Sequence, residues 1–295
     1  MNDPMEAFYE FDKSIDQVFC AILPAASKAI PDLYKQLEKI LDGMCLVSFS
    51  DTYQFLPMWA YYATNFAGMC LEFDTGLLEV GDFRGEPLLE VTYDESPTAP
   101  ISIFALDKLT IQEAGRFLSR KQKQWQHERE WRYITGEGGR RGYLDDALRR
   151  IYLGPRVAPR YKLGILDALR NRPVEILQGR ISRFELAFDV VQEATPLPLC
   201  ERVGAGVFDQ DTVLSDSEKD LRTLLGASYD RLLAECKLTA QHPNTESIMS
   251  IGVSDSDPST WYFWNLYKLR SGREIHDKRY FDRDMRLVGR KLAKP

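Results

Sequence analysis

The chain is poor in the residues that build disulfide frameworks and histidine-rich metal sites. Its 295 residues include five cysteines and three histidines. The cysteines are odd in number, widely spaced and without a Cys-x-x-Cys pair, which favours a reducing compartment and excludes a disulfide or zinc framework. With so few histidines, a histidine-rich metal site is not expected either, so we predict no bound metal.

Long apolar runs and common catalytic signatures are also missing. No stretch approaches the length that spans a bilayer, and the acidic N-terminus MNDPMEAFYEFDKS has no signal-peptide core. We therefore expect a soluble cytoplasmic protein with no membrane partner. The sequence contains no Gly-x-Gly-x-x-Gly, Walker loop, Gly-x-Ser-x-Gly or His-Glu-x-x-His, which argues against the enzyme classes that depend on these motifs.

Charge is present but unevenly distributed. The net charge of −6 gives no overall attraction to nucleic acid or anionic membranes. Residues 268–295, however, hold ten Lys or Arg against four Asp or Glu, which is 10 − 4 = +6, so the rest of the chain carries −6 − 6 = −12. This basic segment either contacts phosphates or forms a solvated helix face or frayed terminus.

Hydrophobic periodicity predicts an α+β or α/β fold with a central mixed β-sheet and flanking helices. A hydrophobic fraction of 44% is enough to fill a real core. Helical spacing and β-prone runs alternate along the chain. Helices are expected at 24–43, from Pro57 to Gly68, at 105–124, 161–171 and 217–241. Strands are expected at 45–50, 69–74, 88–93, 123–134, 148–153, 174–178 and 183–191.

Composition divides the chain into three parts. Residues 1–192 read as the core domain. Residues 193–217 are rich in Pro, Gly, Asp and Ser, which predicts a linker or long loop. Residues 218–295 form a C-terminal extension that begins with an amphipathic helical stretch. It continues into the aromatic run PSTWYFWNLYKLRSG, which is either a strand pair or a docking element.

The stretch KQWQHEREWRYI holds the strongest candidate for a site. In a strand, Glu128, Glu130 and Arg132 share one face, and Arg129 lies on the other. Carboxylates walled by aromatic rings can have a raised pKa, and can act as an acid or base or stabilise a developing cation. The alternative is a ladder of ion pairs between the glutamates and the arginines, which contributes little stability.

Two further patterns are candidates for ligand binding. Alternation in VSFS places Ser48 and Ser50 on one face with Phe49 opposite; these hydroxyls either hold a ribose and orient a glutamate or close the strand into a turn. Trp59 and Tyr62 lie on a short aromatic helix. They either stack on a base or nicotinamide ring or belong to the core.

Several separated motifs resemble one bacterial family. NDPMEAF, VSFS, MWAYYATNFAGMCLEFD, VTY, KQKQWQHEREWRYI and IYLG occur in the order and spacing of the family catalogued as domain of unknown function 2971. The resemblance covers roughly residues 1–191. Met5 stands where the family usually has Phe, and Phe66 where it usually has His. Members usually carry a further strand before the first motif, so we expect a misassigned start or a truncated chain.

The order of these motifs is also similar, by more distant analogy, to that of ADP-ribosyltransferases. That analogy implies that Ser48 or Ser50 braces the site, that Glu130 is the catalytic glutamate and that Glu128 activates or orients the acceptor. It also implies that Trp59 or Tyr62 stacks on nicotinamide and that Arg132 contributes to binding. The Arg-bearing strand of that fold would belong to the missing segment.

The resulting hypothesis is an NAD-consuming transferase or glycohydrolase-like enzyme of a bacterial defence or toxin type. NAD is its expected substrate, and the acceptor is a protein or nucleic acid that the sequence does not specify. The alternative is a non-catalytic module that binds a nucleotide or peptide. A nuclease guided by the basic segment is a third possibility, disfavoured because no Asp/Glu/His metal cluster is visible.

Overall fold

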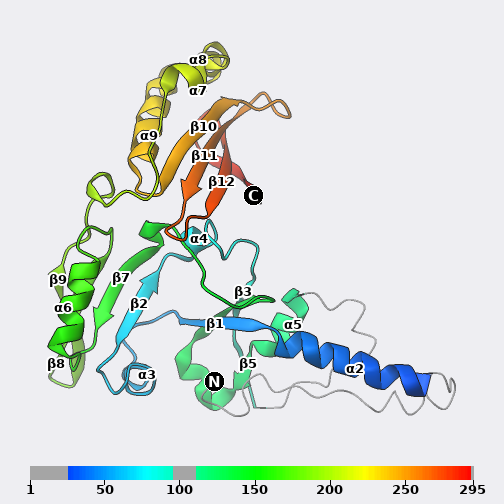
Figure 1. The fold of residues 1–295 in the computed structure, drawn as a ribbon, viewed down its shortest axis with the longest axis vertical. Helices are drawn as coiled ribbons and strands as arrows, with labels where there is room; N and C mark the ends of the chain where they lie inside the picture. The colour runs from blue at the N-terminus through cyan, green and yellow to red at the C-terminus, as the bar shows by residue number, and fades with distance from the viewer. Residues whose placement is uncertain (1–25, 96–110, 294–295) are drawn as a thin grey trace. The chain divides into compact units, whose positions relative to one another are not determined.

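The computed structural model describes residues 26–95 and 111–293, coloured in Figure 1. The first motif of the sequence, which contains Met5, lies outside this range. Contacts within the chain divide it into two compact units. Unit 1 comprises Met1–Phe55 and Gly85–Arg140, and unit 2 comprises Leu56–Arg84 and Arg141–Pro295. Unit 2 therefore holds residues on both sides of position 193.

Unit 1 is built on a three-stranded antiparallel sheet. Strand β6 (Glu130–Thr135) is central and pairs with β1 (Cys45–Ser50) and β3 (Leu88–Glu90). A second, two-stranded parallel sheet joins β4 (Thr92–Asp94) to β5 (Arg120–Gln122). The remaining elements are α2 (Ala26–Asp42), α5 (Ile111–Leu118) and the 3-10 helix η2 (Lys123–Glu128).

The predicted strand over 123–134 is wrong in its first half. Residues Lys123–Glu128 form η2, and Arg129 then adopts a left-handed conformation with φ 48° and ψ 52°. This conformation is incompatible with an extended strand, so β6 begins at Glu130. Glu128 therefore reaches the site from a helical turn. The predicted helix 105–124 is also too long, because its described part ends at Leu118 and β5 follows.

The first sheet of unit 2 has the order β2-β7-β8-β9. The central pair β7–β8 is parallel and the two outer pairs are antiparallel. Buried aliphatic residues of β7 and β8, among them Ile151, Leu153 and Ile176, form its core. The elements are α3 (Leu56–Tyr61), β2 (Met69–Phe73), α4 (Thr75–Leu78), η3 (Asp145–Ala147), β7 (Leu148–Leu153), α6 (Pro159–Ala168), β8 (Glu175–Ser182), β9 (Glu185–Gln192) and η4 (Leu197–Leu199).

The helix expected from Pro57 to Gly68 ends early, at Tyr61. Three consecutive non-glycine residues, Thr64, Asn65 and Phe66, have positive φ and cannot continue a right-handed helix. The turn brings the Phe66 carbonyl oxygen to Gly154, where an added Cβ would lie 2.1 Å from that oxygen. Glycine is required at position 154 because the two backbones approach so closely.

The second sheet of unit 2 is an antiparallel meander in the order β10-β11-β12-β13. Helices α8 and α9 cover one of its faces (Figure 1). The core between them includes Leu221, Leu232, Ile248, Ile251 and Phe263. The elements are α7 (Gln210–Leu214), α8 (Glu218–Leu225), the 3-10 helix η5 (Gly226–Ser228), α9 (Tyr229–Gln241), β10 (Thr245–Val253), β11 (Thr260–Lys268), β12 (Glu274–Asp282) and β13 (Leu287–Ala293).

The fold is thus mixed α+β, as predicted, but it has no single central sheet. The described residues form four small sheets and eight α-helices. The aromatic run at 258–272 contributes β11 of a strand meander, in line with the expected strand pair. The basic segment 268–295 is neither a helix face nor a frayed end, because β12 and β13 occupy most of it. No described helix has both the length and the apolar character needed to cross a bilayer.

Candidate functional site

The pairing of β1 with β6 brings four predicted site residues to one face. Ser48 lies opposite Arg132, and Ser50 lies opposite Glu130. Directly opposed residues of an antiparallel pair project to the same side of the sheet. The Phe49 ring contacts Tyr133 at 5.8 Å on the other side. Two hydroxyls, one carboxylate and one guanidinium therefore share a surface. The alternation in VSFS predicts that Ser48 and Ser50 share a face, and the pairing adds Glu130 and Arg132 to it.

Glu130 is the centre of a buried network of charges. Its two carboxylate oxygens accept a bidentate pair of hydrogen bonds from Arg132, at 2.7 Å from Nε to Oε1 and 3.0 Å from Nη2 to Oε2. Lys121 Nζ donates to Glu130 Oε2 at 2.8 Å and also to Glu128. The exposed fractions of these side chains range from 0% for Arg132 to 6% for Glu130. Two anions and two cations are thus withdrawn from water together, which is the arrangement that buried charges require.

The network shifts the pKa values of Glu130 and Lys121. Burial by itself raises the pKa of Glu130, but hydrogen bonds from Arg132, Lys121 and Ser48 outweigh burial and lower the pKa below its ordinary value. Burial by itself lowers the pKa of Lys121, but hydrogen bonds to Glu128 and Glu130 raise it above its usual range. At neutral pH Glu130 is therefore an ionised carboxylate. The raised pKa expected for an acid catalyst does not apply to it.

Aromatic and neutral polar groups surround the charges. The Tyr93 hydroxyl accepts a hydrogen bond from the Glu130 backbone N–H at 2.8 Å. The Trp125 ring lies 5.7 Å from Lys121 Nζ, within cation–π range. The Ser119 Oγ is buried without a hydrogen-bond partner among the described residues. Ser48 is exposed, so the accessible edge of this face lies at β1.

The two aromatic candidates belong to unit 2. Trp59 is 3% exposed and its ring packs on Phe188 at a centroid distance of 5.6 Å, a core position. Tyr62 is 49% exposed. Because Trp59 and Tyr62 lie in a different unit from Glu130, their stacking on a nicotinamide ring stays a prediction.

The sequence reasoning missed Lys121, which holds both glutamates. The run KQKQW was assigned to the end of a helix, and that assignment hid the short strand β5 carrying Lys121. Because β5 consists of three polar residues, no alternation of residue type marked it as a strand. Lys121 is buried while its neighbours Arg120 and Gln122 are half-buried.

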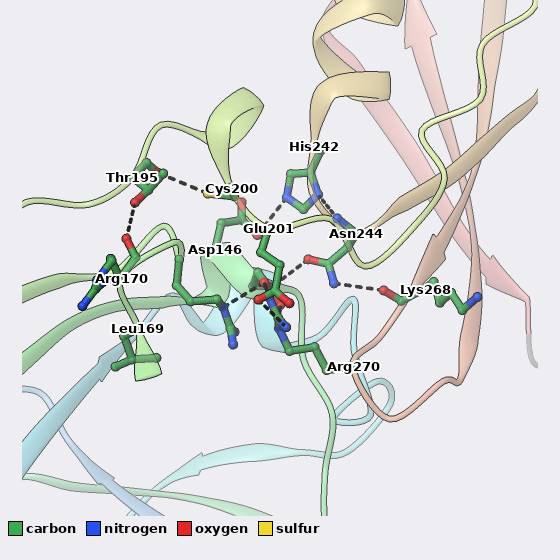
Figure 2. A network of polar contacts seen from close by, with 12 residues as sticks. Asp146, Leu169, Arg170, Thr195, Cys200, Glu201, His242, Asn244, Lys268 and Arg270 are labelled. Carbon is green, nitrogen blue, oxygen red and sulfur yellow. Dashed lines mark hydrogen bonds and ion pairs between the residues drawn. The ribbon is translucent and has the colours of Figure 1, made fainter. Parts of the chain in front are cut away.

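A second polar network, also missed, lies in unit 2 (Figure 2). Its centre is Asp145, which is 1% exposed and accepts hydrogen bonds from Arg270 at 2.8 to 3.1 Å. Arg172 Nε lies 2.9 Å from the same carboxylate. The Asp145 backbone N–H donates to Asn244 Oδ1 at 2.7 Å, and Asn244 Nδ2 donates to the Lys268 carbonyl at 2.9 Å. The network therefore ties η3 to the end of β11.

Histidine and cysteine in this network have structural contacts. His242 Nδ1 accepts from the Asn244 backbone N–H at 3.2 Å, and its Nε2 lies 3.1 Å from Asp146. The Cys200 thiol lies 3.3 Å from the Thr195 carbonyl, to which it donates. Burial raises the pKa of this thiol, which disfavours the reactive thiolate. Within residues 26–95 and 111–293, no group of three or more His, Cys, Asp or Glu is placed to hold a metal ion.

Comparison with known proteins identifies one family. Residues 58–133 match the model of the family described as "Protein of unknown function (DUF2971)". The match begins in α3 and ends in β6, so it includes Lys121, Glu128, Glu130 and Arg132, whereas Ser48 and Ser50 precede it. No curated protein matches the chain, and no solved structure matches it.

Proposed function

We propose that this chain, which carries a DUF2971 family domain at residues 58–133, is an NAD-consuming transferase or glycohydrolase. In this proposal the Glu130 carboxylate stabilises the positive charge that develops on the ribose as nicotinamide leaves. The observation that carries the proposal is the ionised Glu130 on β6 directly opposite Ser50 on β1, with Ser48 bonded to the same carboxylate.

In this proposal, cleavage of NAD needs a negative charge that is held in position before the reaction. When the glycosidic C–N bond of NAD breaks, its electron pair leaves with nicotinamide, which becomes neutral, and the ribose gains oxocarbenium character. A carboxylate already oriented by Arg132 and Lys121 stabilises that charge without reorganising. Water or an acceptor then bonds to the ribose carbon and releases its proton. In this proposal Ser48, which is exposed, contacts the ribose hydroxyls, and Glu128 activates or orients the acceptor.

The distant likeness to ADP-ribosyltransferases gains support from one feature of the sheet. The analogy needs a Ser-x-Ser strand next to a strand that carries the catalytic glutamate. Strands β1 and β6 are hydrogen-bonded neighbours, with Ser50 opposite Glu130. The likeness is one of local arrangement. Glu128 departs from it, because it lies in η2 and not in the strand.

A second candidate function is a nucleotide-binding module without chemistry. It is favoured by the closure of the charge network, in which the two carboxylates face two cations and both Glu130 oxygens are already bonded. A carboxylate so engaged has less freedom to meet a substrate. This candidate predicts nucleotide binding without any release of nicotinamide.

Replacing Glu130 with glutamine tests the enzyme proposal. We expect nicotinamide release from NAD to fall by about 100-fold or more, the effect of removing one preorganised electrostatic group. Glu90→Gln is the matched control, because Glu90 is an exposed carboxylate on β3 of the same sheet, and it should leave the rate unchanged. Ser48→Ala, at an exposed position, should lower the rate without unfolding the protein. Equal rates for Glu130→Gln and the parent chain would remove Glu130 from the mechanism.

A further inference from the structure

The face of the β10–β13 sheet opposite α8 and α9 carries aromatic rings and lysines in two cross-strand rows. One row runs Gly252–Tyr262–Tyr280–Gly289, and the next runs Ser250–Trp264–Lys278–Lys291. We propose that this face, named here the aromatic face, binds single-stranded nucleic acid. The proposal does not depend on Glu130 or on NAD.

The composition of the two faces of this sheet differs. Trp261 and Phe263, which point to the helices, are 2% and 3% exposed and belong to the core. Tyr262 and Trp264 alternate with these two residues along β11, and Tyr280 lies opposite Tyr262 on β12. All three are half-buried. An aromatic residue needs no access to solvent for stability alone, so three half-exposed rings on one sheet face point to a binding surface.

Gly252 leaves room for the Tyr262 ring. A Cβ added at Gly252 would lie 3.0 Å from the Tyr262 hydroxyl oxygen, so the Tyr262 ring leans over that residue. Gly289 lies opposite Tyr280, and a Cβ added there would make an ordinary contact, 3.8 Å from the Tyr280 Cβ. The Tyr262 and Tyr280 ring centroids are 6.4 Å apart. The row Gly252–Tyr262–Tyr280–Gly289 therefore has backbone beside both rings, and the Lys278 ammonium group lies over the Tyr262 ring.

Two lysines of the aromatic face, Lys278 and Lys291, lie beside its rings. Lys278 Nζ lies 3.7 Å from the Tyr262 ring centroid and 5.6 Å from that of Trp264. Lys291 Nζ lies 5.4 Å from the Tyr280 ring centroid. Among the described residues no carboxylate is within ion-pair distance of either ammonium group, unlike Arg290, whose guanidinium is paired with Asp277 on the other face. The two lysines thus keep their charge for an external anion.

Aromatic rings interleaved with unpaired cations fit one class of polymer. Bases of single-stranded RNA or DNA stack on exposed aromatic side chains, and the phosphates between them bind lysine. The four-stranded antiparallel sheet with helices on its other face presents such groups side by side on adjacent strands. A duplex keeps its bases stacked internally, so only its phosphates would meet this surface. The face is therefore expected to prefer single strands.

The test is fluorescence anisotropy of labelled 12-nucleotide oligo-dT and oligo-U titrated with the full chain. Trp264→Ala should weaken binding about 5-fold to 100-fold, the range for loss of one stacked base. Lys278→Gln with Lys291→Gln should reduce the slope of log K against log salt by about 1.4, because two phosphates lose their partners. Preference for oligo-U over oligo-dT would assign RNA, and the reverse would assign DNA.

Tyr161→Ala is the matched control. Tyr161 is 57% exposed in the same unit and its ring also lies near a cation, at 4.7 Å from Arg160 Cζ. It should leave oligonucleotide binding unchanged. Trp264→Phe, which keeps an aromatic ring, should retain most of the affinity and separates stacking from misfolding. No binding of either oligonucleotide at low salt would overturn the proposal. Equal binding of duplex DNA, or equal loss with Tyr161→Ala, would also do so.

Discussion

Replacing Asp145 with asparagine is expected to destabilise unit 2 by about 3 kcal/mol. Removing one partner of a buried ion pair typically costs 3–5 kcal/mol, because the remaining charge stays uncompensated. Asp145 neutralises two guanidinium groups, those of Arg172 and Arg270. The Arg270 side chain is 35% exposed, so solvent compensates part of the loss and we place the effect at the lower end. Urea unfolding of the full chain, followed by circular dichroism, measures the change.

Asp189→Asn provides the control for that experiment. Asp189 accepts from Arg180 at 2.7 Å, but the two side chains are 60% and 54% exposed. Exposed pairs contribute about 0–1 kcal/mol, so this variant should unfold almost as the parent chain does. If Asp145→Asn and Asp189→Asn were equally stable, the network of Figure 2 would have no role in stabilising unit 2.

Replacing Lys121 with methionine is expected to destabilise unit 1 by about 3–5 kcal/mol. The change keeps the length of the side chain but leaves two buried carboxylates, Glu128 and Glu130, with one cation fewer. Hydrogen–deuterium exchange assigns the effect to unit 1, because amide protection in β1, β3 and β6 should fall while that of β10–β13 stays constant. Lys121→Met combined with Glu128→Leu should recover much of the loss, since it removes one charge of each sign.

Lys123→Met is the matched control, two residues further along the chain. Lys123 pairs with Glu95 at 2.7 Å, with side chains 54% and 74% exposed, so its loss should cost at most about 1 kcal/mol. A Lys121→Met chain as stable as Lys123→Met would contradict the buried network.

The stability of the folded chain is expected to fall at acidic pH because of Glu130. The lowered pKa of Glu130 stabilises the folded state above the pKa that this carboxyl has in the unfolded chain. That stabilisation is lost as the pH falls through the folded pKa.

Local patterns predicted which side chains of one strand share a face. Alternation put Ser48 with Ser50 and Glu130 with Arg132, and the register of β1 and β6 confirms both pairs. The pairing of these two strands, which brings the four residues to one face, was not predicted. The helical turn that carries Glu128 was missed because the left-handed Arg129 has no signature in residue type. Left-handed backbone is usually marked by glycine or asparagine, and neither is present there.

Contacts between residues far apart in sequence were beyond prediction from pattern alone. Asp145 and Arg270 are separated by 125 positions, and only the folded chain shows that they meet. The division of the strands into four small sheets was not predicted for the same reason, since it too depends on contacts between distant residues. Strands such as β1, β2 and β9 are readable from their own residues, but the partner of a strand is set by tertiary packing. The meander β10–β13 shows this, because the basic residues of β12 and β13 gave no sign that they pair with the aromatic β11.

The central claim is that the chain binds NAD and cleaves it at the face of β1 and β6. The most direct measurement is calorimetric titration of NAD into the full chain, with nicotinamide release followed in the same sample. The account predicts saturable binding accompanied by release of nicotinamide. Binding without release would support a nucleotide-binding module, and neither binding nor release by a well-folded sample would contradict the account and leave the two glutamates as structural charges.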